Sequence, residues 1–258
     1  IVGGLLLYGA FEGGRAIGNF FQKLYNYAVD HDIDTGYWGE IWGDLKDFPR
    51  DLFGDIANFF NQAQNFRLRS DPLTLDLDGD GLETTNANSK GGAILFDHNN
   101  DGIKNGTGWV KSDDGFLVFD RNGNGKIDNG SELFGDSTTL SNGKKAVDGF
   151  AALADQDTNK DGKVDANDAN WSQLKIWRDL NQDGISQTNE LFSLENLGIV
   201  QLKTQKTEHS QILANGNEIA DLGTYLKADG TTGAISSQKM GDINLAEYSF
   251  YRQFINKL

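Results

Sequence analysis

Two segments of this chain carry aspartate or asparagine at alternate positions before a central glycine. They read DTNKDGKVDAND at 157–168 and DLNQDGISQTNE at 179–190. Ca²⁺ prefers six to eight oxygen ligands, which alternate carboxylates and amides in a tight loop supply, and the glycine permits the sharp bend. Both segments match an EF-hand loop position by position. The sequence therefore predicts two complete calcium loops.

The closing ligand at position 12 differs between these two loops. Glu190 is the usual glutamate, whereas Asp168 has a shorter side chain, which should change the geometry of its loop. Position 7 would contribute a backbone carbonyl in each. The predicted ligands are Asp157, Asn159, Asp161, Lys163 (by its carbonyl), Asp165 and Asp168 in the first loop, and Asp179, Asn181, Asp183, Ile185 (by its carbonyl) and Glu190 in the second.

Three further segments begin with the same pattern but have no acid at position 12. The last of them has an acid one residue late. Such loops bind calcium where distant residues complete the ligand shell, or they are simply turns rich in Asp and Asn, and both interpretations stay open. Their candidate ligands are Asp76, Asp78 and Asp80, then Asp97, Asn99 and Asp101, and finally Asp120, Asn122, Asn124, Asp128 and Glu132.

The charge of the chain agrees with cation binding. Residues 71–258 hold 29 acidic and 17 basic residues, which gives −12 of the net −15. An acidic chain of this kind excludes a nucleic-acid partner, which would require clustered Lys and Arg. With no cysteine, neither a disulfide nor a thiolate metal site can form.

The chain starts at Ile1 rather than Met, so we expect a piece of a longer protein. Its apolar opening run, residues 1–11, is too short to span a membrane. Membrane contact is therefore expected only through sequence upstream of residue 1.

Hydrophobic spacing predicts a mixed α+β fold. Residues 1–70 have aromatic residues at helical spacing and form a predicted helical segment. Residues 71–258 form a second, calcium-dependent module with short antiparallel strands, including alternating leucines at 73–77. Residues 146–197 return to helical spacing. We therefore expect the two complete loops to form an EF-hand-like helix–loop–helix pair, joined by a helix containing Trp171, Leu174 and Trp177.

Asp71–Pro72 is the only Asp-Pro pair, and it stands at the boundary between these segments. An aspartate carboxyl can attack its own carbonyl carbon and close a five-membered anhydride, expelling the relatively basic proline nitrogen. Holding the two groups in near-attack geometry is worth about 7–11 kcal/mol. By itself, however, the dipeptide is more often a turn or the start of a strand.

The context of this pair resembles a known family. The run SDPLTLDLDGDGLET at 70–84, the stretches DGFLVFD at 114–120 and GSELFGD at 130–136, and the paired loops are similar to the self-processing module of Gram-negative repeat-in-toxin (RTX) proteins, the FrpC-like family. The resemblance covers residues 70–250, and residues 1–70 would lie upstream of the cut.

This resemblance implies a secreted, extracellular protein in which Ca²⁺ folds the module and triggers a single cleavage. Asp71 would be the nucleophile and Pro72 the leaving group. The resulting anhydride would be hydrolysed, or captured by a lysine amine of the same or another protein as an Asp–Lys isopeptide crosslink. None of the histidines (His31, His98 and His209) stands at a catalytic spacing.

Two alternatives stay open. The chain could be a purely structural calcium module of a secreted adhesin or toxin, with Asp71–Pro72 inert. It could also bind partners through a groove that calcium opens between EF-hands. Met240 is the single methionine, whereas such grooves are usually rich in methionine.

Overall fold

The computed structural model describes residues 69–87, 93–229 and 234–254. The chain divides into two compact units, Ile1–Arg67 and Leu68–Leu258, and all the described residues belong to the second. The helical segment expected at 1–70 lies outside the described residues, except for its last two, which form a strand. Within the described part of the chain, no helix is long and apolar enough to cross a membrane.

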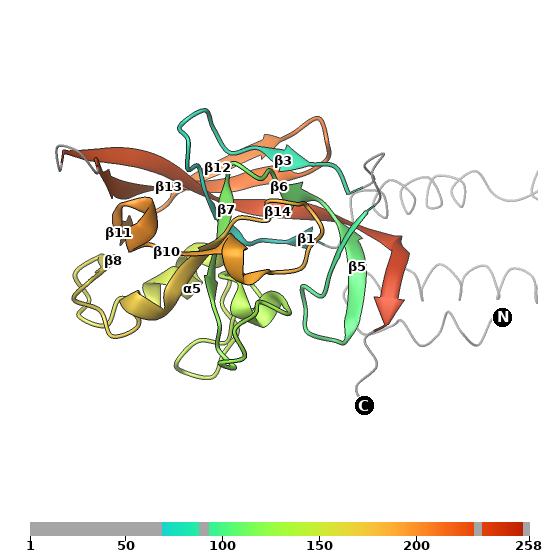
Figure 1. Ribbon diagram of the computed structural model, residues 1–258, viewed down its shortest axis with the longest axis horizontal. Coiled ribbons are helices and arrows are strands. Elements are labelled where there is room, and N and C mark those ends of the chain that lie inside the picture. The colour runs from blue at the N-terminus through green and yellow to red at the C-terminus, as the bar shows by residue number, and fades with distance from the viewer. Residues whose placement is uncertain (1–68, 88–92, 230–233, 255–258) are drawn as a thin grey trace, which may run out of the picture. The chain divides into compact units, whose positions relative to one another are not determined.

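The predicted α+β class is wrong for the described residues, which are mostly β (Figure 1). They contain a single α-helix, α5 (Gly149–Ala154). The strands are β1 (Arg69–Ser70), β2 (Leu73–Leu75), β3 (Thr84–Thr85), β4 (Ile94–Phe96), β5 (Ile103–Thr107), β6 (Trp109–Val110), β7 (Gly115–Phe119), β8 (Lys163–Asp165), β9 (Leu174–Trp177), β10 (Leu191–Ser193), β11 (Ile199–Lys203), β12 (Thr207–Ile212), β13 (Glu218–Ala228) and β14 (Ile235–Phe254), and the 3-10 turns are η3 (Gly130–Glu132), η4 (Trp171–Gln173), η5 (Thr188–Glu190) and η6 (Glu195–Leu197).

One large antiparallel sheet organises the module. Its main path runs β10-β9-β7-β2-β14-β13-β11-β8, and β1, β5 and β12 attach to the two longest strands. Strand β14 crosses most of the molecule, forming a hairpin with β13 at one end and pairing with β5 at the other (Figure 1). Strand β2 is central because it lies between β14 and β7.

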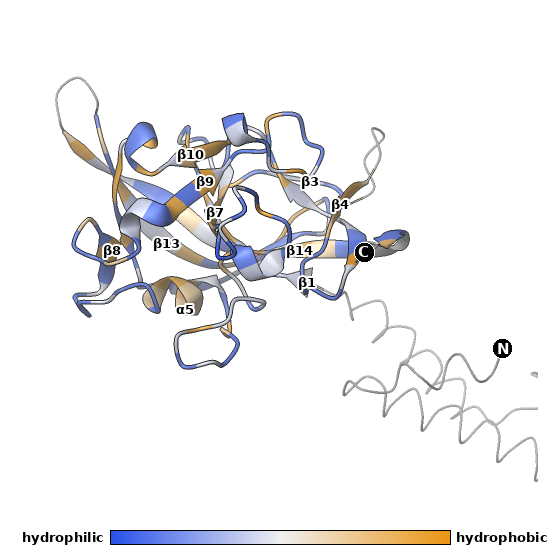
Figure 2. Ribbon diagram, turned by 60° about the horizontal axis from the view of Figure 1, so that its bottom comes forward, coloured by the Kyte–Doolittle hydropathy of each residue, from blue (hydrophilic) through white to orange (hydrophobic). Residues whose placement is uncertain are grey.

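The sheet separates two hydrophobic cores, and polar loops surround it (Figure 2). Leu73 and Leu75 of β2 point to the core that α5 covers. The other core is aromatic. Trp109 packs edge-to-face on Phe116 and on Trp177, with ring centroids 4.8 and 5.2 Å apart. Strands buried on both faces explain why the apolar runs of this chain are nearly continuous.

The helix expected between the two complete loops does not exist. Residues 171–173 form the turn η4, and residues 174–177 form strand β9, which pairs with β7 and β10. Leu174, Ile176 and Trp177 are all buried, because β9 lies inside the sheet. Burial on both faces produced a spacing that imitates a helix, so the EF-hand helix pair is wrong.

Candidate functional site

The Asp71–Pro72 bond lies between β1 and β2, which pair with the same strand. The residues on both sides of the bond follow one continuous antiparallel register with β14. Ile243 N–H donates to the Pro72 carbonyl at 3.3 Å, and proline has no N–H to return. In such a pair both backbone groups face the partner strand, so the Pro72 nitrogen is directed toward β14.

The Asp71 carbonyl lies on the other side of its strand, against the backbone of Gly135. A β-carbon built on Gly135 would lie 2.8 Å from the Asp71 carbonyl oxygen and 3.2 Å from its carbonyl carbon. Because the first distance is shorter than real contacts of that kind, only glycine permits this approach. The segment around Gly135 therefore packs directly on the bond.

The Asp71 carboxyl is held by the same segment. Asp136 N–H donates to Asp71 Oδ1 at 2.6 Å. Burial, followed by the negative charge of Asp136, raises the pKa of Asp71 from 3.8 to about 8. A small pocket beside the bond is lined by Ser70, Asp71, Pro72, His98, Gly130, Leu133, Gly135, Asp136 and Ser137.

Among the described residues, His98 is the one histidine that lines this pocket. It is 3% exposed, and burial lowers its pKa to about 3. Its Nε2 lies 3.0 Å from Thr107 Oγ1, whose hydroxyl donates to the Gly108 carbonyl at 2.8 Å. The imidazole is thus neutral at physiological pH, and its one N–H is donated to Thr107 Oγ1.

Four predicted loops share one set of internal hydrogen bonds: 97–108, 120–131, 157–168 and 179–190. In each, the N–H at position 5 donates to the side chains at positions 1 and 3, and the N–H at position 6 donates to position 1. The glycine at position 6 has φ between +70° and +86°, which favours glycine. Complete and incomplete loops therefore have the same opening structure.

The closing acids of the two complete loops fold back in the same way. Glu190 Oε1 accepts Leu180 N–H at 2.9 Å, and its Oε2 accepts Gln187 N–H at 3.2 Å. Asp168 accepts the N–H groups at the same two loop positions, at 2.7 and 2.9 Å. The shorter aspartate side chain therefore reaches the equivalent backbone groups.

Glu132 closes the 120–131 loop although it stands one residue late. Its Oε2 accepts Asp128 N–H at 2.8 Å. Its Oε1 is buried and has no hydrogen-bond partner among the described residues, and the residue is only 1% exposed. A buried carboxylate oxygen without a donor is costly unless a cation neutralises it. This site, built from oxygen donors, therefore fits Ca²⁺.

The first incomplete loop is closed by a residue that the sequence pattern did not predict, Asp114. Its Oδ1 accepts Leu77 N–H at 3.1 Å and its Oδ2 accepts Glu83 N–H at 3.0 Å. Carboxylate oxygens of Asp76, Asp78 and Asp114 lie within 4.8 Å of one another. No local spacing reveals Asp114, because only the pairing of β2 with β7 brings its turn to this loop. The remaining predicted ligand, Asp80, is exposed, with its N–H 3.3 Å from Asp78 Oδ1.

We expect Asp114→Asn to weaken calcium binding at this loop by about 10- to 100-fold, because it removes one of three clustered negative charges. Calorimetric titration with Ca²⁺, in an Asp71→Ala background in which the predicted cut cannot occur, measures the weakening of one class of sites. Asp113→Asn is the matched control, since it removes the neighbouring charge outside the cluster. Identical isotherms for the two variants would exclude a role for Asp114.

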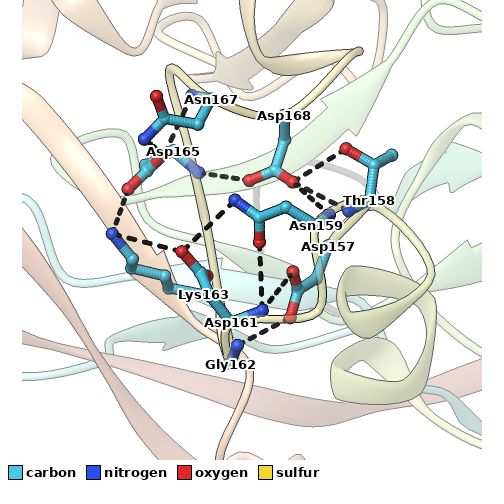
Figure 3. A network of polar contacts seen from close by, with 9 residues as sticks. All are labelled: Asp157, Thr158, Asn159, Asp161, Gly162, Lys163, Asp165, Asn167 and Asp168. Carbon is cyan, nitrogen blue, oxygen red and sulfur yellow. Dashed lines mark hydrogen bonds and ion pairs between the residues drawn. The ribbon is translucent and has the colours of Figure 1, made fainter.

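The 157–168 loop has a cation of its own (Figure 3). Lys163 Nζ lies 2.5 Å from Asp165 Oδ2 and 3.5 Å from Asp161 Oδ2. The lysine was predicted to contribute only its carbonyl. Its ammonium group contacts carboxylates at positions 5 and 9, so it balances part of the charge that Ca²⁺ would neutralise.

The loops contact one another in a different arrangement from the one expected. Ile127 N–H donates to Ser186 Oγ at 2.7 Å, which joins position 8 of the 120–131 loop to position 8 of the 179–190 loop. The 97–108 loop also contacts the 120–131 loop, because Gly130 N–H donates to the Asp97 carbonyl at 2.8 Å. The predicted pair of 157–168 with 179–190 is thus replaced by a cluster centred on 120–131.

The loop cluster is connected to the Asp71–Pro72 bond. Glu132 directly precedes the segment that contacts Asp71, and Phe134 of that segment accepts Leu73 N–H at 2.8 Å. The predicted calcium ligands of the 120–131 loop and the residues that contact the Asp71–Pro72 bond are thus only a few residues apart in the sequence.

Known proteins share this stretch of the chain. The SPM domain family matches residues 73–244. The iron-regulated protein FrpA of Neisseria meningitidis serogroup C is 53% identical over 188 residues, which are 73% of this chain. The chain spans only 16% of the length of that relative.

Proposed function

Because this chain belongs to the SPM domain family, we propose that residues 71–258 form a calcium-triggered module that cuts its own backbone between Asp71 and Pro72. The observation that carries the proposal is the position of the Asp71 carboxyl. It is held by Asp136 N–H while the backbone of Gly135 packs on the scissile carbonyl. Fixing a carboxyl beside its own carbonyl is what converts a slow reaction into a fast intramolecular one.

The reaction replaces the peptide C–N bond by a C–O bond and transfers one proton from an acid to the nitrogen. A carboxylate oxygen of Asp71 bonds to the Asp71 carbonyl carbon, and the bond from that carbon to the Pro72 nitrogen breaks. The nitrogen takes up a proton and becomes a new N-terminus. Asp71 is left as a five-membered cyclic anhydride, which is an acylating group.

The calcium loops supply the trigger in this proposal. Bound Ca²⁺ would hold the carboxylates of each loop together, and such binding is coupled to folding. Glu132 would then fix the segment after η3, and that segment holds the Asp71 carboxyl and carbonyl. The predicted ligands outside this cluster, in the 157–168 loop, would stabilise the fold around α5.

The anhydride has two fates in this proposal. Water opens it to a free C-terminal aspartate, or the amine of a lysine, on this or another protein, forms an Asp–Lys isopeptide bond. Lys206 is a poor acceptor, because hydrogen bonds to Asp148 and Asp221 raise its pKa and keep it protonated.

The resemblance to RTX proteins supports an exported, extracellular setting for this module. In that setting the calcium concentration rises when the chain leaves the cell, so the cut would follow export. We propose that the module acts there within a longer RTX-type protein.

Purification under chelator followed by millimolar Ca²⁺ tests the proposal. Intact-mass analysis should show fragments of residues 1–71 and 72–258, with Pro72 as the new N-terminus. Higher-mass adducts that disappear when amines are blocked would report the isopeptide branch. A chain that folds in calcium and stays whole would instead favour the structural module with an inert Asp71–Pro72 bond.

A further inference from the structure

We propose that Asp242 is the acid that donates a proton to the Pro72 nitrogen as the bond breaks. This inference rests on the self-cleavage proposed above and names the proton donor that the reaction requires. It is drawn from the place of Asp242 in the sheet and from the surroundings of its carboxyl.

Asp242 and Asp71 lie on the same face of the sheet. Asp242 of β14 is directly opposite Leu73 of β2, and side chains two residues apart on a strand share a face. Asp71, two residues before Leu73 in the same register, is therefore a diagonal neighbour of Asp242. Diagonal neighbours have Cβ atoms about 7–8 Å apart or less, and at this separation the negative charge of Asp71 acts on the Asp242 carboxyl.

Asp242 and Asp136 are the two candidate proton donors near the bond. They lie on opposite sides of the strand that contains it. The Pro72 nitrogen is directed toward β14, the strand that carries Asp242. Asp136 lies on the opposite side, with Gly135 and the scissile carbonyl. An amide nitrogen is protonated perpendicular to its peptide plane, which in a strand means from a face of the sheet. Asp242 therefore lies on the β14 side of the bond, where the Pro72 nitrogen is. Asp136 lies on the opposite side, where it donates its N–H to the Asp71 carboxyl.

The carboxyl of Asp242 is arranged to hold a proton. It is 1% exposed, and its Oδ2 accepts Gly149 N–H at 3.0 Å. Its Oδ1 is buried and has no partner among the described residues. Burial and the negative charge of Asp71 raise the pKa of Asp242 well above its usual range.

The charged neighbours of Asp242 do not neutralise it as an anion. Asp148 before α5 and Asp221 on β13 lie beside it, with oxygens of the three carboxyls within 4.8 Å of one another. Lys206 Nζ lies 2.8 Å from Asp148 and 2.8 Å from Asp221. Its charge is thus shared between those two carboxylates, which leaves the acid form of Asp242 favoured.

Asp71 and Asp242 then share one proton, because two neighbouring buried carboxyls do not both ionise. The backbone donor on Asp71 favours its anion, and the unpartnered Oδ1 of Asp242 favours its acid form. When the bond breaks, the Asp242 O–H bond breaks and the Pro72 N–H bond forms. Asp242 becomes a carboxylate, which can accept the proton of the water or amine that opens the anhydride.

The test is the single-turnover cleavage rate of Asp242→Asn after Ca²⁺ addition. Asparagine keeps the size and the acceptor for Gly149 N–H but cannot donate a proton as an acid. Loss of a general acid should slow cleavage by about 10²- to 10⁴-fold. Glu208→Gln is the matched control, because it removes an exposed carboxyl from β12, outside the cluster of Asp148, Asp221 and Asp242, and it should cut at nearly the wild-type rate.

The pH profile separates proton donation from a structural role. For the wild type in saturating Ca²⁺ we expect the cleavage rate to show a bell-shaped dependence on pH. Below the lower pKa of the pair, both acids are protonated and the nucleophile is lost; above the upper pKa, both are ionised and the donor is lost. Asp242→Asn should lose the alkaline fall and keep the acid one. If Asp242→Asn does not fold in calcium, the wild-type profile still decides, since a rate that does not fall up to about pH 10 excludes an acid donor of this kind.

The possible failures are distinguishable. Wild type that stays whole in calcium contradicts the self-cleavage itself. Wild type that is cut, with Asp242→Asn cut at the same rate and with the same pH profile, overturns the role of Asp242 and leaves the self-cleavage standing.

Discussion

Replacing Asp71 with alanine is expected to stop cleavage completely while leaving calcium binding intact. The variant removes the carboxyl that we propose as the nucleophile, and no other side chain can close a five-membered ring on that carbonyl. The intramolecular arrangement supplies about 7–11 kcal/mol, so its loss returns the bond to the stability of an ordinary peptide. Intact mass after prolonged incubation in Ca²⁺ measures this.

The control for Asp71→Ala is its folding. Tryptophan fluorescence should change on Ca²⁺ addition as in the wild type, because Trp109 and Trp177 lie in the aromatic core. Stability should not suffer, since burial raises the pKa of Asp71 and its carboxylate is disfavoured in the fold. A cut at residue 71 in the folded variant would show that another group is the nucleophile.

Glu132→Gln is expected to raise the calcium concentration for half-maximal cleavage by about 10- to 100-fold. The amide cannot neutralise Ca²⁺ as the carboxylate does, and Glu132 leads directly into the segment that holds Asp71. Cleavage rates across a calcium titration measure the shift. At saturating calcium the rate should approach that of the wild type.

Glu195→Gln is the matched control for Glu132→Gln, because it removes the same charge from an exposed 3-10 turn. Its calcium dependence should equal that of the wild type. Equal titration curves for the two variants would contradict the link between the 120–131 loop and the Asp71–Pro72 bond.

The loops were the part of the structure that the sequence predicted best. Ligand spacing depends on a few neighbouring residues, so the opening half of each loop can be read locally. The closing half is less local. Glu132 accepts from the loop although it stands one residue late, in the turn η3, and Asp114 comes from the turn that precedes β7. Only the tertiary structure determines such contacts.

The fold class failed for a related reason. Trp171, Leu174 and Trp177 repeat every three residues, which is typical of a helix. In the structure they belong to a turn and a strand inside a sheet that is buried on both faces. A strand of that kind has no polar face, so its sequence lacks the alternation of apolar and polar residues that usually marks a strand. The two neighbouring EF-hand-like sequence patterns then favoured the prediction of a helix–loop–helix pair.

The two sides of the Asp71–Pro72 bond are anchored very unequally. Pro72 leads into β2, which is fastened on both edges by β14 and β7. Ser70 belongs to the two-residue strand β1, which pairs with β14 alone among the described strands. Once the bond breaks, the new amine would stay in the middle of the sheet, whereas the piece ending in the activated Asp71 could peel away. The fragment that carries the anhydride would thus be the one that can move, and it could meet a lysine on another molecule. It would leave the Pro72 amine faster than the two ends could form the peptide bond again.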